Sequence, residues 1–119
     1  MDVLLDTNII IEHLQSGLLQ DTPDEIRFAI SVVTMAELLR LPGIGHDEVY
    51  LIEDFISLTK VIDVDASIAR KAAFLGRTSK TRLPDLLIAA TCIEYRLPLI
   101  TKNLKDYANL SDLEVRDEI

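Results

Sequence analysis

The chain opens with the stretch VLLDTNIIIEHL (residues 3–14), in which an apolar run, one acid and a helical pattern follow one another. Residues 3–5 are a predicted strand, and because polar residues do not alternate in it, both of its faces should be buried. Asp6 ends this strand and precedes a predicted helix over residues 8–14. Because Asp caps helix N-termini well, Asp6 could serve that helix alone. A chemical role for it therefore depends on the rest of the chain.

The same order of elements repeats along the sequence. Runs rich in Val, Ile and Leu alternate with helical patterns, which predicts crossover units on a parallel sheet. We therefore expect one α/β domain over residues 1–119, with three layers (helix–sheet–helix) and a mostly parallel central sheet of four to five strands. The predicted strands are 3–5, 28–33, 60–64, 98–101 and a weaker one at 113–115, and the predicted helices are 8–14, 35–41, 47–58, 66–77 and 85–95.

Composition narrows the class of protein. The chain has 119 residues and is 49% hydrophobic, enough for one core. No apolar run reaches the ~18 residues of a membrane span, and the start MDVLLDTN lacks the basic region of a signal peptide. We therefore expect a cytoplasmic protein without membrane association. The single Cys92, within the apolar AATCI, is expected to be a buried thiol.

Two acids follow predicted strands, and a third begins a predicted helix. Asp6 follows the first strand, Glu37 follows the second, and Asp85 begins a helix whose next eight residues carry no charge. Each acid has a local explanation. Asp85 suits the first turn of a helix, and Glu37 has the T-x-x-E spacing of a capping box with Thr34. Taken one at a time, these acids do not demand a chemical role.

The polar residues after the fourth strand add a further junction, with Thr101, Asn103 and Asp106. In a parallel sheet the carboxyl ends of all strands meet at one edge, where ligands bind. Several carboxylates at that edge would repel one another unless a cation lay between them. Oxygen ligands without Cys or His partners suit Mg²⁺ or Mn²⁺, and such an ion can activate water against a phosphodiester.

Charge restricts how the chain could hold a nucleic acid. The formal net charge is −8, so long-range attraction of a polyanion should be poor. One local exception is RTSKTR (residues 77–82), which has three positive charges and no negative one. By itself this stretch could be a solvated loop after a helix.

Four blocks in order carry a family resemblance: LLDTNIIIEHL, SVVTMAELL, RLPDLLIAATCIEYRLPLIT and TKNLKDY. Together they resemble the PIN-domain nucleases, most closely the VapC-type toxin ribonucleases, over nearly the whole chain. The resemblance implies that Asp6, Glu37 and Asp85 are the first three acids of the site. Many members have Asp where this chain has Asn103, and others have an acid three residues later, at the position of Asp106. The fourth metal ligand and the number of metal ions therefore remain open.

The resemblance also implies a function. The protein would be a Mg²⁺- or Mn²⁺-dependent endoribonuclease that leaves 5′-phosphate and 3′-hydroxyl ends, and the toxin of a toxin–antitoxin pair. A protein antitoxin, an RNA substrate and a homodimer are the expected partners. Thr7, Asn8, Thr101 and Asn103 would orient metal ligands and water. The expected contacts to the RNA backbone are Arg77, Lys80 and Arg82 before Asp85, with Lys102 and Lys105 on the opposite rim beside Asp106.

Two other functions would fit parts of this sequence. A receiver-type phosphoacceptor domain has a similar length and strand–helix order, but it needs an acidic pair where this chain has Asp6-Thr7-Asn8. It would also leave Glu37 without a role. A PIN fold that binds a partner without cutting RNA is the second alternative. The presence of Asp6, Glu37 and Asp85 argues against it.

Overall fold

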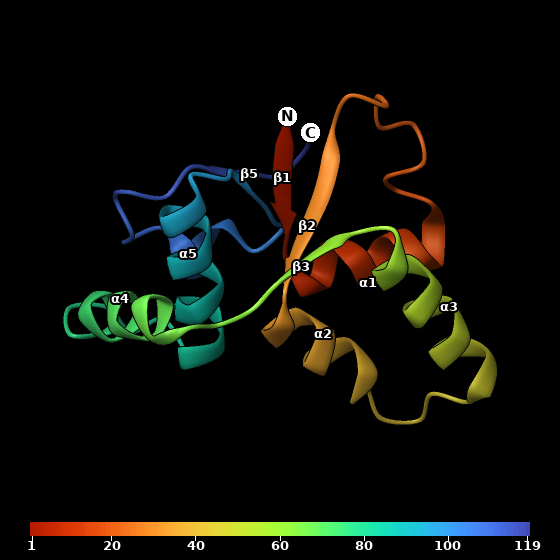
Figure 1. Ribbon diagram of the computed structural model, residues 1–119, viewed down its shortest axis with the longest axis horizontal. Coiled ribbons are helices and arrows are strands. Elements are labelled where there is room, and N and C mark those ends of the chain that lie inside the picture. The colour runs from red at the N-terminus through yellow and green to blue at the C-terminus, as the bar shows by residue number, and fades with distance from the viewer.

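The computed structural model describes residues 1–119 and places five parallel strands in one sheet, in the order β3-β2-β1-β4-β5 (Figure 1). Every strand pair is parallel, so the expected α/β class and parallel sheet are confirmed. The strands are β1 (Asp2–Leu5), β2 (Arg27–Ser31), β3 (Lys60–Ile62), β4 (Leu99–Ile100) and β5 (Val115–Arg116).

Helices cover both faces of this sheet. On one face lie α1 (Thr7–Ser16), α2 (Val32–Leu39) and α3 (His46–Ser57), and on the other lie α4 (Ala66–Gly76) and α5 (Leu83–Tyr95) (Figure 1). A short 3₁₀ helix, η1 (Leu104–Tyr107), follows β4 and was not expected. None of these helices is long and apolar enough to cross a membrane.

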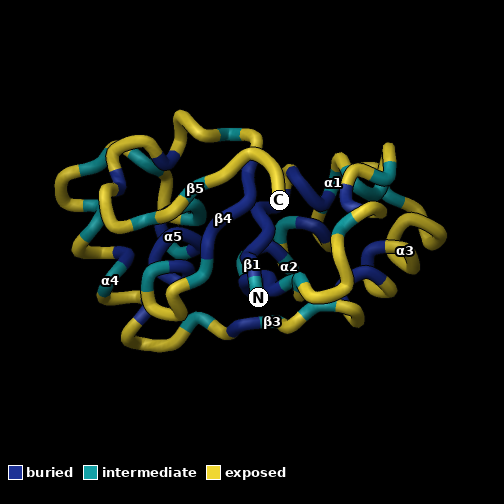
Figure 2. The backbone as a smooth tube through the Cα atoms, turned by 90° about the horizontal axis from the view of Figure 1, so that it is seen from above, coloured by how far each residue is buried: buried dark blue, intermediate teal, exposed yellow.

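The sheet divides the core into two clusters. Along β1, Val3 and Leu5 pack with α1 to α3, whereas Leu4 packs with α4 and α5. Because both faces of the strand are covered, its three buried positions, residues 3–5, are all apolar. The middle of α5 is buried, as Figure 2 shows, and Cys92 there is 1% exposed, as predicted. The charge-free run after Asp85 is therefore buried in the core and holds the start of α5, with Asp85, in place.

The strand order creates a crevice beside β1. From β1 the chain winds outward through β2 to β3, then returns to β4 on the other side of β1. At such a switch point the connections leave neighbouring strands in opposite directions, which opens a ligand site at their carboxyl ends. Receiver domains have the order 2-1-3-4-5, so this sheet argues against the phosphoacceptor alternative.

The second strand and helix differ most from prediction. The strand ends at Ser31, and α2 starts at Val32, three residues earlier than expected. The Ser31 hydroxyl caps the helix by accepting a hydrogen bond from the Val33 amide at 3.1 Å. The proposed capping box of Thr34 and Glu37 is therefore wrong, because both residues lie inside α2. Glu37 has no capping role that competes with a role in a site.

Candidate active site

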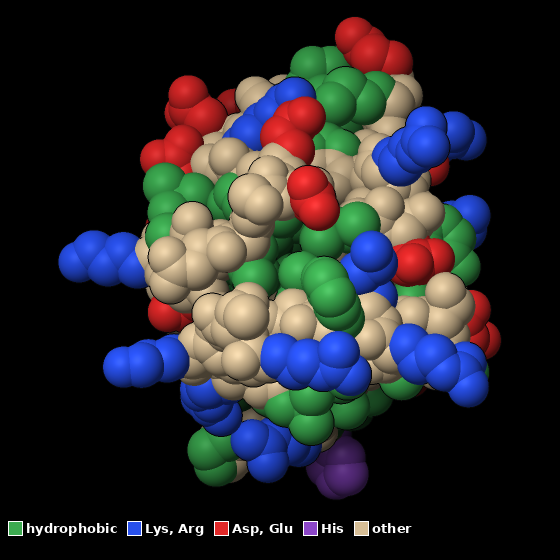
Figure 3. All heavy atoms as spheres, turned by 90° about the vertical axis from the view of Figure 1, so that its left-hand side faces the viewer, with side chains coloured by type: hydrophobic (Ala, Val, Ile, Leu, Met, Phe, Trp, Pro, Cys, Tyr) green, Lys and Arg blue, Asp and Glu red, His purple; other side chains and the backbone are tan.

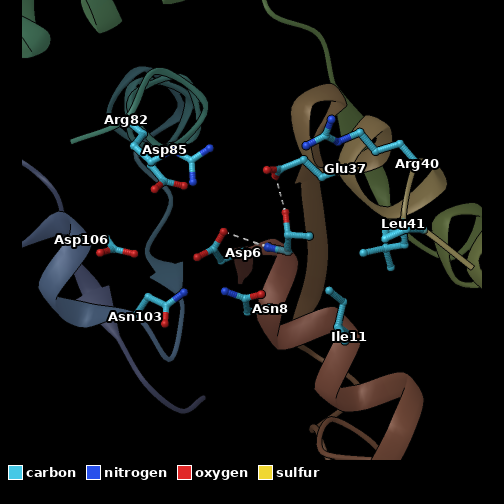
Figure 4. Close-up of a pocket in the computed structure, with 12 residues that line it drawn as sticks. Asp6, Asn8, Ile11, Glu37, Arg40, Leu41, Arg82, Asp85, Asn103 and Asp106 are labelled. Carbon is cyan, nitrogen blue, oxygen red and sulfur yellow. Dashed lines mark hydrogen bonds between the residues drawn. The ribbon is translucent and has the colours of Figure 1, made fainter.

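Four acids from four separate elements line one open cavity of about 570 Å³ at the carboxyl edge of the sheet (Figure 4). Asp6 is the N-cap of α1 directly after β1, and Asp85 lies in the first turn of α5. Glu37 comes from α2, and Asp106 from η1. The crevice predicted from strand order thus contains all four expected acids.

Asp6 is the most buried of the four, with 5% of its surface exposed. Its Oδ1 accepts from the Thr7 amide at 2.8 Å, and its Oδ2 accepts from the Thr101 hydroxyl at 2.7 Å. Burial raises the pKa of Asp6 above its ordinary value, these hydrogen bonds oppose the rise, and the charge of Glu37 adds to it. A nearby cation would lower the pKa of Asp6 again, because it favours the ionised carboxylate.

Glu37 is held by the first turn of α1. The Thr7 hydroxyl donates to Glu37 Oε1 at 2.7 Å, and it also lies 3.2 Å from the buried Thr34 hydroxyl. Because a carboxylate only accepts, the Thr7 proton points to Glu37. The residue after Asp6 in the chain thus orients a second acid from another helix, whereas Thr34 was not expected to take part.

Asp85 is half-buried and has an unexpected neighbour. The Tyr107 hydroxyl makes a long hydrogen bond of 3.4 Å to Asp85 Oδ1. Burial raises the pKa of Asp85, and the negative charges of Asp6 and Asp106 raise it further. The hydrogen bond from Tyr107 opposes the rise. Burial, with Asp6 and Asp85 close by, raises the pKa of Tyr107 too, so its hydroxyl stays protonated and acts as a donor.

The remaining rim is polar on the side of η1. Asp106 is exposed, and both it and Asn103 line the cavity, as does Asn8 from α1 (Figure 4). The backbone amide of Asn103 donates to the Thr101 hydroxyl at 3.0 Å, which links this loop to the residue that holds Asp6. Both candidates for the fourth ligand are therefore present at the cavity.

The expected cations separate into different places. Arg82 lines the acidic cavity, and Lys80 and Lys105 line a neighbouring one together with Arg82. Lys105 is thus on the same side as Lys80, and its predicted place on the opposite rim is wrong. Arg77, at the C-cap of α4, lines neither cavity, and Lys102 lines a separate cavity with Asp117 and Glu118.

Sequence reasoning missed several side chains at this site. Tyr107 directly follows Asp106 in LKDY, and that adjacency was the only feature of the sequence that pointed to a place for Tyr107 at the site. Arg40 extends towards Glu37 on the wall opposite Asp85, where Ile11 and Leu41 add apolar surface (Figure 4). Arg40 had no signal beyond its place one turn after Glu37.

The donor set fits a hard divalent cation. The four acids supply only oxygen, no Cys or His lines the cavity, and the pKa values of Asp6 and Asp85 are raised by burial and by neighbouring negative charge. As they lie, no three Asp, Glu, His or Cys side chains stand close enough together to hold one ion. The carboxylates would have to draw together for several of them to share an ion.

Comparisons with known proteins identify the family and support the fold. The sequence model of the PIN domain family matches residues 3–112. Ribonuclease VapC1 of Methanocaldococcus jannaschii is 29% identical over 120 residues, which cover 96% of this chain and 85% of that protein. A chain of a toxin–antitoxin complex from Klebsiella pneumoniae superposes with a TM-score of 0.80 at 30% identity, over 98% of this chain and 99% of that one. VapBC-1 from nontypeable Haemophilus influenzae gives a TM-score of 0.82 at 24% identity, over 98% of both chains, and supports the fold.

Proposed function

The chain belongs to the PIN domain family, and we propose that it is a Mg²⁺- or Mn²⁺-dependent endoribonuclease that acts as the toxin of a toxin–antitoxin pair. The observation that carries this proposal is the convergence of Asp6, Glu37, Asp85 and Asp106 on one cavity at the switch point of the sheet. The similarity to Ribonuclease VapC1 supports RNA as the substrate.

In this proposal Asp6, Glu37 and Asp85 hold the metal, and Asp106 assists them. A bound Mg²⁺ or Mn²⁺ would polarise the phosphodiester, lower the pKa of an attacking water and stabilise the leaving oxygen. The protein keeps the acids in place. Thr101 and the Thr7 amide fix both oxygens of Asp6, and the Thr7 hydroxyl fixes Glu37. Asn8 and Asn103 line the same cavity and would bind water or substrate oxygen.

The cavity walls differ in a way that suits a single strand of RNA. Arg82 and Arg40 stand on different sides of the acids and would contact backbone phosphates. Ile11 and Leu41 form an apolar surface beside Arg40, on which an unstacked base could pack. An RNA duplex would not present such a base, so single-stranded segments are the proposed targets.

The test is cleavage of single-stranded RNA with Mn²⁺, with Mg²⁺ and with EDTA. The wild type should cut only with metal and leave 5′-phosphate ends, which mass spectrometry of the products identifies. Asp85→Asn should lose this activity, whereas Asp54→Asn, at an exposed acid of α3 away from the cavity, should keep it. A folded wild type that cuts no RNA with either metal would favour the non-cutting binding module instead.

The proposed partners are a protein antitoxin and a second copy of this chain. The solved complexes with this fold include toxin–antitoxin assemblies. Large apolar side chains are exposed here on α3, α4 and α5, among them Tyr50, Leu51, Phe74 and Leu83. Co-expression with the neighbouring reading frame, followed by light scattering of the purified species, tests both partners. A monomer that retains no product of that frame would contradict both.

A further inference from the structure

A second, smaller cavity of about 400 Å³ opens beside the acidic one, and none of its lining residues is apolar. We call it the basic annex and define it by its three cations, Lys80, Arg82 and Lys105. Asp85, Asp106 and Arg82 line both cavities, so the annex adjoins the acids of the proposed active site. Thr81 and Asn109 complete its wall with neutral polar groups.

The three cations have no ionic partner within the protein. The two ion pairs of the structure are Arg27 with Asp2 and Arg116 with Glu114, both elsewhere. All three annex cations are exposed, and they form no ion pair although two acids line the same cavity. The side of the molecule seen in Figure 3 carries many Lys and Arg side chains, and its acidic side chains lie mostly in the upper half, in a chain with a net charge of −8.

Hydrogen bonds hold the annex against the active-site edge. The Thr81 hydroxyl donates to the backbone carbonyl of Asp106 at 2.9 Å, and it accepts from the Ser79 hydroxyl at 2.8 Å. The Thr81 amide donates to Ser79 Oγ at 3.1 Å. Lys80 and Arg82 flank Thr81 in the chain, so these bonds place both cations beside η1, which carries Lys105.

We propose that the basic annex binds the backbone phosphate next to the one that is cut, through Lys80, Arg82 and Lys105. This inference rests on the proposed ribonuclease function, because it assigns the position of the substrate on that same site. A phosphate in the annex places its neighbour along the strand over Asp85 and Asp106, which border both cavities. The contact is with the backbone and carries no sequence information.

The annex also couples phosphate binding to metal binding. Asp85 and Asp106 oppose an anion in the annex while they are ionised and unpaired. A divalent cation among the acids removes that repulsion and leaves the three positive charges dominant. RNA should therefore bind more tightly with metal than without it, and the gain should depend on the annex cations.

The experiment compares two variants with the same loss of three positive charges. The annex variant is Lys80→Gln/Arg82→Gln/Lys105→Gln, and the control is Lys60→Gln/Arg70→Gln/Lys71→Gln, at positions outside both cavities. Each is assayed with a short single-stranded RNA that has one cut site, and with copies in which one flanking phosphate is a neutral methylphosphonate. The readouts are kcat/KM with Mn²⁺ and the fluorescence anisotropy of a copy of the RNA that cannot be cut, measured with Mn²⁺ and with EDTA at several salt concentrations.

The annex variant should cut the unmodified RNA about tenfold or more slowly than the control variant, since it loses charge-assisted contacts to phosphate. One methylphosphonate position should slow the wild type to a similar extent and should not slow the annex variant further. In the annex variant the slope of log K against log salt should be flatter than in the control variant by about 0.7, the contribution of one phosphate of a single strand. The inference is overturned if the annex and control variants behave alike, or if every methylphosphonate slows both proteins equally.

Failure of the proposed function would look different. A wild type that binds RNA without cutting it would contradict the ribonuclease, while the anisotropy arm would still decide whether the annex cations contact phosphate. A wild type that neither binds nor cuts single-stranded RNA would overturn both. Circular dichroism and the melting temperature of each variant establish that it is folded.

Discussion

The Thr101 hydroxyl donates a hydrogen bond of 2.7 Å to Oδ2 of Asp6, across 95 positions of sequence. Asp6 follows β1 and Thr101 follows β4, the two neighbouring strands at which the sheet changes direction. Both side chains are buried, and the bond is one of two that fix the Asp6 carboxylate. The topology of the sheet, rather than any local motif, thus sets the orientation of the first acid.

Thr101→Val should destabilise the fold, because it leaves Asp6 Oδ2 without its donor and the Asn103 amide without its acceptor. Loss of a buried hydrogen bond to a charged group costs about 1–3 kcal/mol of the free energy of unfolding. Urea unfolding of the variant and the wild type measures this difference. The loss should be smaller at pH 4 than at pH 7, since a protonated Asp6 depends less on this donor. Thr101→Ser keeps the hydroxyl and is the matched control. Equal stability of the Val and Ser variants would contradict the assignment.

How far the site could be predicted depends on whether each feature is local. Asp6, Glu37 and Asp85 were predicted because each follows a recognisable apolar strand or begins a recognisable helix, and parallel strands end at one edge. The start of α2 was misjudged because Ser31 and Thr34 are both good N-caps, and only the tertiary structure shows which residue caps the helix. The capping interpretation of Glu37 failed for that reason.

Features that join distant segments could not be predicted. Tyr107 reaches Asp85 only because η1 packs against α5, and sequence spacing does not encode that contact. Lys105 and Lys80 share one cavity because Thr81 bonds to the backbone of Asp106, whereas the linear order suggested opposite rims. The acids were therefore easier to predict than the surface that surrounds them.

Stability without metal should fall as the pH rises above about 4. Asp6 and Asp85 have pKa values above their ordinary value of 3.8 in the folded protein, so the folded state holds protons that the unfolded state releases. The free energy of unfolding contributed by these groups therefore decreases from pH 3.8 up through their raised pKa values and then levels off. Urea unfolding in EDTA between pH 4 and 8 measures this dependence. For Asp85→Asn the free energy of unfolding should fall less with rising pH than it does for the wild type, or it should rise. Parallel curves for wild type and Asp85→Asn, with Asp54→Asn as control, would refute this.

Millimolar Mn²⁺ or Mg²⁺ should raise the melting temperature of the wild type, because the cation relieves repulsion among the acids that line the cavity. Binding to the folded state alone adds about 2.7 kcal/mol at a hundredfold excess over Kd. Asp85→Asn should melt at a similar or higher temperature without metal and gain less from it. Scanning calorimetry with and without EDTA measures both effects. The same gain in both proteins would place the cation somewhere other than at Asp85.

Glu37→Gln separates a metal ligand from a structural residue. Gln can still accept the hydrogen bond from the Thr7 hydroxyl, so the fold and its melting temperature should be kept. The charge is lost, and RNA cleavage with Mn²⁺ should fall by about a hundredfold or more, as when one strong electrostatic contact is removed from a catalytic site. Because Ser31 caps α2, a capping effect cannot account for such a loss. Full activity in Glu37→Gln would assign this residue a structural role only.

Tyr107→Phe should alter metal binding while sparing the fold. The ring of Tyr107 is packed in the core beside α5 and is kept in Phe, so the cost in stability should stay within about 1.5 kcal/mol, that of one ordinary hydrogen bond. Without the hydroxyl, Asp85 loses a donor that favours its ionised form, and its pKa rises further. A protonated carboxyl is a poor ligand, so Mn²⁺ should begin to raise the melting temperature at a higher pH than in the wild type. The control is Tyr95→Phe. It also removes a tyrosine hydroxyl, but from an exposed position at the end of α5. If all three proteins gain thermal stability from Mn²⁺ over the same pH range, Tyr107 only fills space, and the long hydrogen bond to Asp85 has no part in holding the metal.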